Sequence, residues 1–140
     1  MTRAGAERMG RILTAVLGIG FVLIGLRYFF DFFDPGALTV ETDVAIPTIK
    51  ALMEVRTVYG RMFVGVGLTI ALLGWRRATL VPALWALVLI SGCVALARVA
   101  AVALGQAPDP LFTALLVVEL VGIALALWAL HGLRAATVHP

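Results

Sequence analysis

The sequence predicts an all-α protein: a bundle of four transmembrane helices with both termini in the cytoplasm. Hydrophobic residues make up 62% of the chain and charged residues 14%, with a mean hydropathy of +1.06. Soluble domains contain about 45–50% apolar and about 25% charged residues. The apolar residues gather in four long stretches, and the arginines concentrate on one side of the membrane that these stretches define. We expect residues 1–140 to form a single integral membrane domain.

Each apolar stretch is close to or longer than the length of about 20 residues that a helix needs to cross a bilayer. Turn-forming residues separate the stretches: Asp-Pro-Gly at 34–36, then Pro47, two arginines at 76–77, and a Pro-Asp-Pro turn at 108–110. Pro47 suits the first turn of the second helix, which therefore starts before its apolar part. The predicted helices cover about residues 12–30, 47–74, 79–104 and 111–130.

Two features concern the first helix. Charged residues precede its apolar run, as in a secretory signal, but Arg27, Tyr28 and Phe29 follow the run where a cleavage site would need small residues. We therefore expect this helix to be retained in the membrane. Gly18 and Gly25 share one of its faces, which predicts close packing against another helix.

The basic residues predict the orientation. With four helices both termini share one side, and that side carries six arginines: Arg3, Arg8, Arg11, Arg76, Arg77 and Arg134. The opposite loops carry Lys50 alone, together with five acidic residues. Because basic residues are enriched in cytoplasmic loops, we expect both termini in the cytoplasm, the 31–50 loop outside, and the protein in a bacterial inner membrane.

Ionisable residues also lie inside the predicted helices, all of them toward the outer side. Arg98 is about two turns from the end of the third helix, and Glu119 is about two turns into the fourth. A charge at the centre of a membrane helix costs about 2.5–3.5 kcal/mol, which favours side chains that face one another. We therefore predict a polar pocket in the outer half of the bundle, formed by Arg56, Tyr59, Arg98 and Glu119, with Glu54 and Arg27 at its rim.

Within this pocket, Arg98 and Glu119 are the predicted contact. They have matched depths on consecutive helices, and an arginine fork can bind a carboxylate through two hydrogen bonds. Glu119 has no charged neighbour on its own helix, so Arg98 is its expected partner. An ionisable pair in the membrane is a candidate functional site, although a buried pair can also serve only to fix helix register.

The second helix leaves two arrangements open. Glu54 and Arg61 are seven residues apart and share one face, whereas Arg56 and Tyr59 fall on roughly the other face. Both faces cannot point into one small bundle. We expect Arg56 and Tyr59 to point inward, while the other face meets another subunit or Arg61 extends outward to the headgroups.

Several classes of function are not indicated. The net charge of +3 comes without the basic stripe and exposed aromatic residues of a nucleic-acid-binding surface. The single cysteine, Cys93, sits in an apolar run, and no metal-ligand spacing such as His-Glu-x-x-His is present. We therefore expect no nucleic acid, no metal and no cofactor. The expected partners are membrane lipids, a lipophilic small molecule, and a second copy of the chain or a larger membrane complex.

The string EVRTVYGRMFVGVGLTIALLGW, residues 54–75, carries a resemblance. It resembles the E-x-R-x-x-Y-G-x-x-x-x-G-x-G-L pattern of small four-helix bacterial membrane proteins, a family of unknown function near the DoxX-like group. The pattern falls on Glu54, Arg56, Tyr59, Gly60, Gly65 and Gly67. Arg61 stands where many relatives have a second glycine. The resemblance extends over about residues 12–130 and implies a four-helix bundle, but it implies no activity.

Three functions are compatible with these patterns. The first is binding of a lipophilic molecule whose polar or anionic head is held by the arginines. The second is a small membrane enzyme of the isomerase or cyclase type, with Glu119 as proton donor or base and Tyr59 as its hydrogen-bond partner. Arg98 argues mildly against this, because a guanidinium stabilises the ionised carboxylate and weakens it as an acid. The third is a structural subunit in which the charges only fix register.

Overall fold

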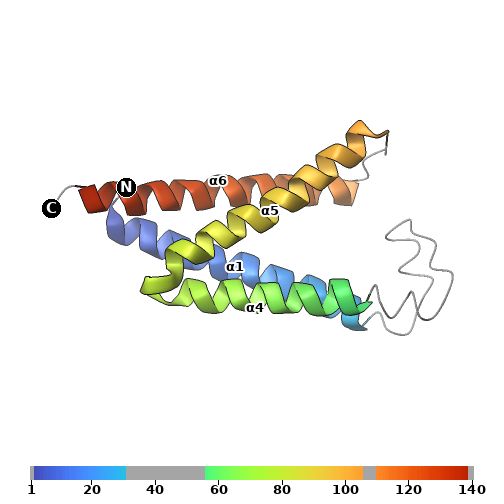
Figure 1. Ribbon diagram of the computed structural model, residues 1–140, viewed down its shortest axis with the longest axis horizontal. Helices are drawn as coiled ribbons and strands as arrows, with labels where there is room; N and C mark the ends of the chain where they lie inside the picture. Colours follow the sequence, from blue (N-terminus) through green and yellow to red (C-terminus); the bar gives the residue numbers. More distant parts are fainter. Residues whose placement is uncertain (1, 31–55, 106–109, 139–140) are drawn as a thin grey trace. The chain divides into compact units, whose positions relative to one another are not determined.

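A computed structural model describes residues 2–30, 56–105 and 110–138, and all regular structure in these ranges is helical. The helices are α1 (Arg3–Phe30), α4 (Met62–Trp75), α5 (Leu80–Ala103) and α6 (Pro110–Val138) (Figure 1). A π-helical turn, η2 (Arg56–Arg61), leads into α4, and a 3₁₀ turn, η3 (Arg77–Thr79), leads into α5. The predicted all-α class with four helices is confirmed.

Within the described ranges, three helical segments are long and apolar enough to cross a membrane: Arg3–Arg27, Arg77–Ala103 and Phe112–Ala135. Met62–Trp75 is a shorter apolar helix, and residues 47–55, where its beginning is predicted, lie outside the described residues. α1 begins at Arg3 rather than near residue 12, and α6 ends at Val138 rather than near residue 130. The apolar stretch marks only the membrane-crossing part, and the adjoining alanines and arginines also favour helix.

Local signals explain where the helices begin and end. The hydroxyl of Thr2 accepts a hydrogen bond from the N–H of Gly5 at 3.2 Å and so caps the start of α1. After α5, Gly105 adopts φ +92°, which favours glycine, and its N–H donates to the carbonyl of Val102 at 3.0 Å. α6 begins with Pro110, whose missing N–H costs nothing in a first turn.

The connection between α4 and α5 is tight. The hydroxyl of Thr79 donates to the carbonyl of Leu73 at 2.6 Å, which satisfies one of the carbonyls left open at the end of α4. Pro82 lies in the first turn of α5, where the backbone N–H groups have no partner within the helix. The turn therefore reverses the chain without interrupting either helix.

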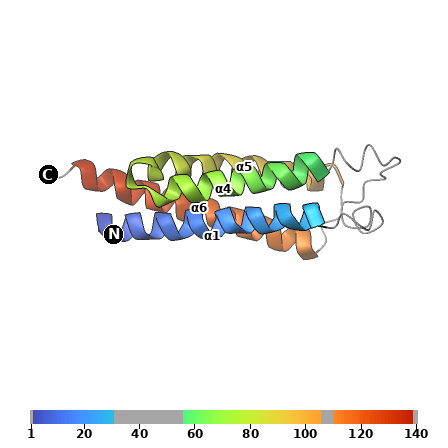
Figure 2. The same cartoon turned by 90° about the horizontal axis from the view of Figure 1, so that it is seen from below.

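Packing divides the chain into two units: residues 1–16 with 70–140, and residues 17–69. In the first unit α5 packs along α6, and α1 begins at the same end at which α6 ends (Figures 1 and 2). The α6 alanines Ala126 and Ala129 have no exposed surface, and such small residues allow close approach in a membrane. The buried residues of α5 lie along one face of the helix: Leu80, Ala83, Leu84, Leu87, Ser91 and Ala95.

The second unit pairs the later half of α1 with η2 and the first part of α4. Glycines form this contact, since a Cβ added at Gly25 would lie 2.6 Å from the carbonyl oxygen of Gly60. A Cβ added at Gly67 would likewise meet the carbonyl oxygen of Gly18. The close packing predicted for Gly18 and Gly25 is therefore confirmed.

Candidate functional site

Arg98 of α5 and Glu119 of α6 form an ion pair within the first unit. The Nε of Arg98 donates a hydrogen bond to Oε1 of Glu119 at 3.2 Å, from one helix of the hairpin to the other. The two side chains are 23% and 15% exposed, so the pair is largely enclosed by protein. The contact that the sequence predicts between these residues is confirmed.

The position of the pair follows from the geometry of consecutive helices. Arg98 is five residues from the end of its apolar segment at Ala103, and Glu119 is seven from the start of its segment at Phe112. At 1.5 Å per residue these separations are about 8 and 10 Å along the helix axes. Because α5 and α6 run in opposite directions, both side chains reach the same depth inside the apolar segments.

Phe112 completes the surroundings of the pair, although it is not among the predicted site residues. The guanidinium carbon of Arg98 lies 5.2 Å from the centre of the Phe112 ring, which is a cation–π contact. Phe112 precedes Glu119 by seven residues, or about two helical turns, so the two lie on one face of α6. This spacing is the sequence signal that identifies it. One face of α6 thus holds the guanidinium through a ring and a carboxylate.

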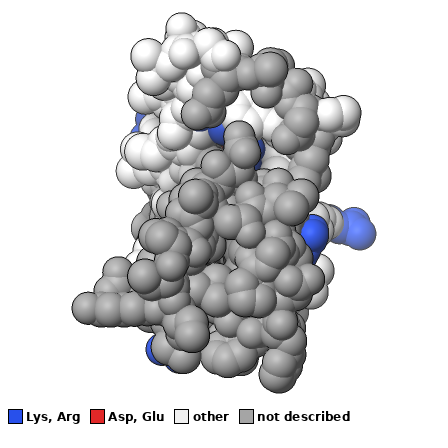
Figure 3. Space-filling view, turned by 90° about the vertical axis from the view of Figure 1, so that its right-hand side faces the viewer, with Lys and Arg blue, Asp and Glu red and all other residues white. Residues whose placement is uncertain are grey.

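The second carboxylate oxygen of Glu119 has a different environment. Oε2 is buried and has no hydrogen-bond partner among the described residues. In the end view of Figure 3, the visible charged surface of the described residues is that of Lys and Arg. A buried polar atom without a partner costs about 1–3 kcal/mol. A hydrogen-bond donor from another molecule would remove this cost.

The remaining predicted pocket residues lie in the second unit or outside the described residues. Arg27 is on α1 with an exposed side chain, and the backbones of Arg56 and Tyr59 lie in η2. Glu54 lies outside the described residues. Of the six predicted residues the structure therefore brings together Arg98 and Glu119, and a pocket formed by all six stays a prediction.

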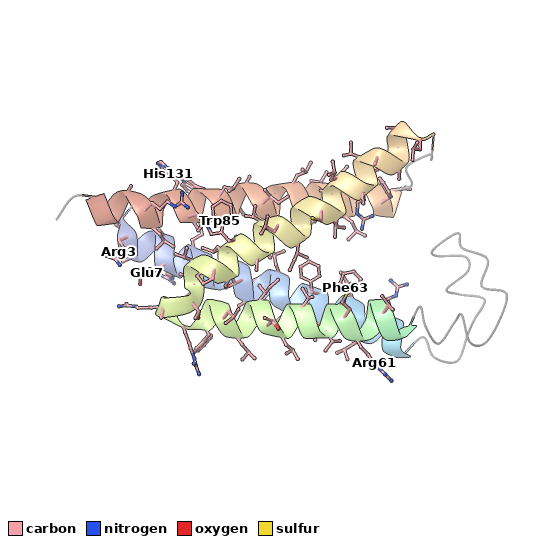
Figure 4. The ribbon with its side chains drawn as sticks, viewed as in Figure 1. Arg3, Glu7, Arg61, Phe63, Trp85 and His131 are labelled. Carbon is pink, nitrogen blue, oxygen red and sulfur yellow. The ribbon has the colours of Figure 1, made fainter. Side chains whose placement is uncertain are left out.

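Part of the motif of the second helix, from Arg56 to Gly60, falls on π-helical backbone. Tyr59 and Gly60 both lie in η2, and π-helical turns are frequent at functional sites. Gly60 is buried and packs against Gly25. Arg61 is exposed and points away from α4 (Figure 4). This orientation agrees with the alternative in which Arg61 extends outward.

The apolar helices define a membrane protein whose helical hairpin contains a largely buried ion pair. Comparison with protein families gives a more particular assignment. Residues 9–130 match the family described as "Domain of unknown function (DUF4345)", and the chain belongs to this family. The expected membership of an uncharacterised family is confirmed. Neither the curated proteins nor the solved structures gave a match.

Proposed function

We propose that the protein binds a lipophilic molecule with a polar or anionic head at the Arg98–Glu119 pair. The observation that carries this proposal is an ion pair within apolar helices whose carboxylate has one buried oxygen that no described residue contacts through a hydrogen bond. Charges in a membrane segment are costly to insert. Apolar residues in place of a buried pair are often equally stable, so stability alone does not explain the pair, whereas a ligand that uses it does.

The pair offers complementary groups to such a head. The guanidinium of Arg98 would donate to a carbonyl, carboxylate or phosphate oxygen, and Oε2 of Glu119 would accept from a hydroxyl. Val102 lies one turn from Arg98 on α5 and is 41% exposed, so a tail has apolar surface to contact next to the pair. A head that carries both an oxygen acceptor and a hydroxyl donor fits these groups best.

The proposal includes the other features predicted from the sequence. The proposed binding site lies in the outer leaflet of a bacterial inner membrane, and the participation of Arg27, Glu54, Arg56 and Tyr59 stays a prediction from the sequence. The resemblance of the Glu54–Leu68 pattern to proteins near the DoxX-like group supports a distant relationship to that group. A role limited to helix register is the alternative that the experiment below distinguishes.

The experiment compares the molecules that co-purify with the wild type and with the double variant Arg98→Met/Glu119→Leu. This variant removes both charges at similar side-chain size, so we expect it to fold but to lose an amphiphile that mass spectrometry detects in the wild type.

The matched control is Leu96→Met/Leu120→Met. It changes two positions of the same helices that are 69% and 52% exposed, and it should keep the bound molecule. An unchanged set of bound molecules in a folded Arg98→Met/Glu119→Leu variant would contradict the proposal and support a register role.

A further inference from the structure

A second ion-pair arrangement lies in the first unit, where α1 meets η3. The Nε of Arg3 is 3.5 Å from Oε1 of Glu7, and the Nε of Arg77 is 3.1 Å from Oε2. Arg3 lies one turn before Glu7 on α1 (Figure 4), whereas Arg77 comes from η3. The Glu7 side chain is 17% exposed, but those of Arg3 and Arg77 are 59% and 77% exposed. Both guanidinium groups therefore remain accessible to another anion.

Two open cavities flank Glu7, and arginines line both. The larger cavity, about 600 Å³, includes Arg3, Arg77 and Arg134 in its wall. The smaller cavity, about 470 Å³, includes Arg8, Arg11 and Arg77. We call these five arginines and Glu7 the Glu7 cluster; with one carboxylate it carries a net charge of +4. Volumes of this size are those of ordinary ligand sites, about 300–1,000 Å³.

Two of these arginines, Arg11 and Arg134, line the cavities without contacting Glu7 through an ion pair that the structure records. The Nε of Arg11 is buried and has no hydrogen-bond partner among the described residues. A buried donor on a charged group is costly when it has no acceptor, and an anion bound in the smaller cavity, which Arg11 lines, would lower this cost. Beside the larger cavity, the guanidinium carbon of Arg134 lies 5.6 Å from the centre of the Trp85 ring, which fixes its position.

The position of the cluster favours a lipid over a soluble anion. Arg3 and Arg77 are the first residues of two segments long and apolar enough to cross a membrane, so the cluster lies at the level of the lipid headgroups. Leu80, Val81 and Leu133 line the larger cavity together with its arginines. A soluble phosphate would make no favourable contact with this apolar wall. The part of an acyl chain nearest the headgroup would pack against it. Basic pockets between membrane helices are known sites for anionic lipid heads.

We propose that the Glu7 cluster binds the phosphate group of an anionic phospholipid at the membrane surface on which both termini lie. Planar arginine groups bind phosphate oxygens in pairs, and Glu7 holds Arg3 and Arg77 in position for this contact. The site is separate from the proposed ligand at Arg98, because 21 residues between Arg77 and Arg98 correspond to about 30 Å along a helix.

Native mass spectrometry of the full chain in a non-ionic detergent tests this site. The protein is titrated with phosphatidylglycerol and with phosphatidylcholine of the same acyl chains, and we expect at least tenfold tighter binding of phosphatidylglycerol. The Arg98→Met/Glu119→Leu variant, which lacks the other proposed site, should keep the part of the phosphatidylglycerol binding that depends on Arg77, so the two proposals can fail separately. Equal affinity of the wild type for both lipids would overturn the site.

Two neighbouring arginines provide a matched comparison. Arg77→Gln should weaken phosphatidylglycerol binding at least tenfold. Arg76→Gln makes the same charge change at an exposed position that is not among the residues lining either cavity. General attraction to an anionic surface predicts at most about a fivefold loss for either change. Equal losses in the two variants would show that only this general attraction acts, and would overturn the site.

Arg11→Lys decides the question if Arg77→Gln does not fold. It keeps the charge but removes the planar fork and the buried Nε donor, so we expect about fivefold weaker binding. Wild-type affinity in Arg11→Lys would overturn the proposal. A final experiment adds inorganic phosphate at millimolar concentration to the complex with phosphatidylglycerol. We expect the lipid to stay bound. Displacement of the lipid would overturn the proposal and identify a soluble phosphate as the ligand.

Discussion

The Nε of Arg98 lies 3.2 Å from Oε1 of Glu119, although the two residues are 21 positions apart in the sequence. The contact joins α5 to α6 inside their apolar segments, where an unpaired charge is costly. Each charge therefore depends on the other. Single and double replacements of this pair distinguish its contribution to the stability of the fold from its proposed role in ligand binding.

The first prediction concerns stability. Arg98→Met alone and Glu119→Leu alone should each lower the free energy of unfolding by about 3 kcal/mol, because each strands one charge in an apolar environment. The double variant should lie within about 1 kcal/mol of the wild type, since it leaves no charge behind. The free energy of unfolding of all three variants is measured in mixed micelles that contain increasing amounts of a denaturing detergent. A double variant as unstable as the sum of the single variants would show that the pair is not coupled.

The ring of Phe112 should contribute through its contact with Arg98. Phe112→Leu is expected to lower the free energy of unfolding by about 1 kcal/mol beyond the lost apolar area, because it removes a cation–π contact. The same change in an Arg98→Met background should cost less, since no cation is left for the ring. Equal costs in both backgrounds, measured in the same micelles, would mean that the ring acts only by its size.

Gly25 should tolerate no larger residue, because its added Cβ would lie 2.6 Å from the carbonyl oxygen of Gly60 and 2.7 Å from the amide nitrogen of Val64. These are backbone atoms that cannot rotate away, so Gly25→Ala should destabilise the protein by about 1–3 kcal/mol. Gly20→Ala is the matched control on the same helix: its Cβ would meet nothing within 4 Å, and it should be neutral or slightly stabilising. Thermal unfolding in detergent compares the two, and indistinguishable midpoints would argue against close packing at Gly25.

Cysteine labelling tests the predicted orientation. Cys93 is exposed, so the background is Cys93→Ala. In intact cells Thr42→Cys should react with a membrane-impermeant maleimide, and Thr137→Cys should react only after the membrane is opened. This pattern follows from the excess of arginines on the side of the termini. Labelling of Thr137→Cys from outside would reverse the topology.

The helices and the Arg98–Glu119 contact were predictable from the sequence because a membrane leaves few alternatives. Backbone polar groups in lipid must be satisfied within a helix, and a charge in lipid is costly enough to require a partner. Depth along each apolar stretch then identifies which charges meet. The Arg98–Glu119 contact could therefore be predicted without knowing the crossing angle between the two helices.

Other features depend on packing and were not predictable. The Arg3–Glu7 pair is visible in the sequence, as residues four apart on a helix, whereas the Arg77–Glu7 contact forms only when the fold brings Arg77 to the start of α1. The π-helical turn over Arg56–Arg61 also changes the helix phase. Face assignments that assume 3.6 residues per turn are therefore not valid across it.

The charge-swap variant Arg98→Glu/Glu119→Arg tests most directly whether the pair binds a ligand. It keeps one carboxylate and one guanidinium on facing helices, so a pair that only fixes register is preserved, whereas the donors and acceptors offered to a head group are exchanged. The measurement is the amount of co-purifying amphiphile per protein by mass spectrometry, with thermal stability in the same detergent. We predict stability close to that of the wild type and at least tenfold lower occupancy. Wild-type occupancy in a stable swap variant would contradict a ligand site at Arg98 and Glu119.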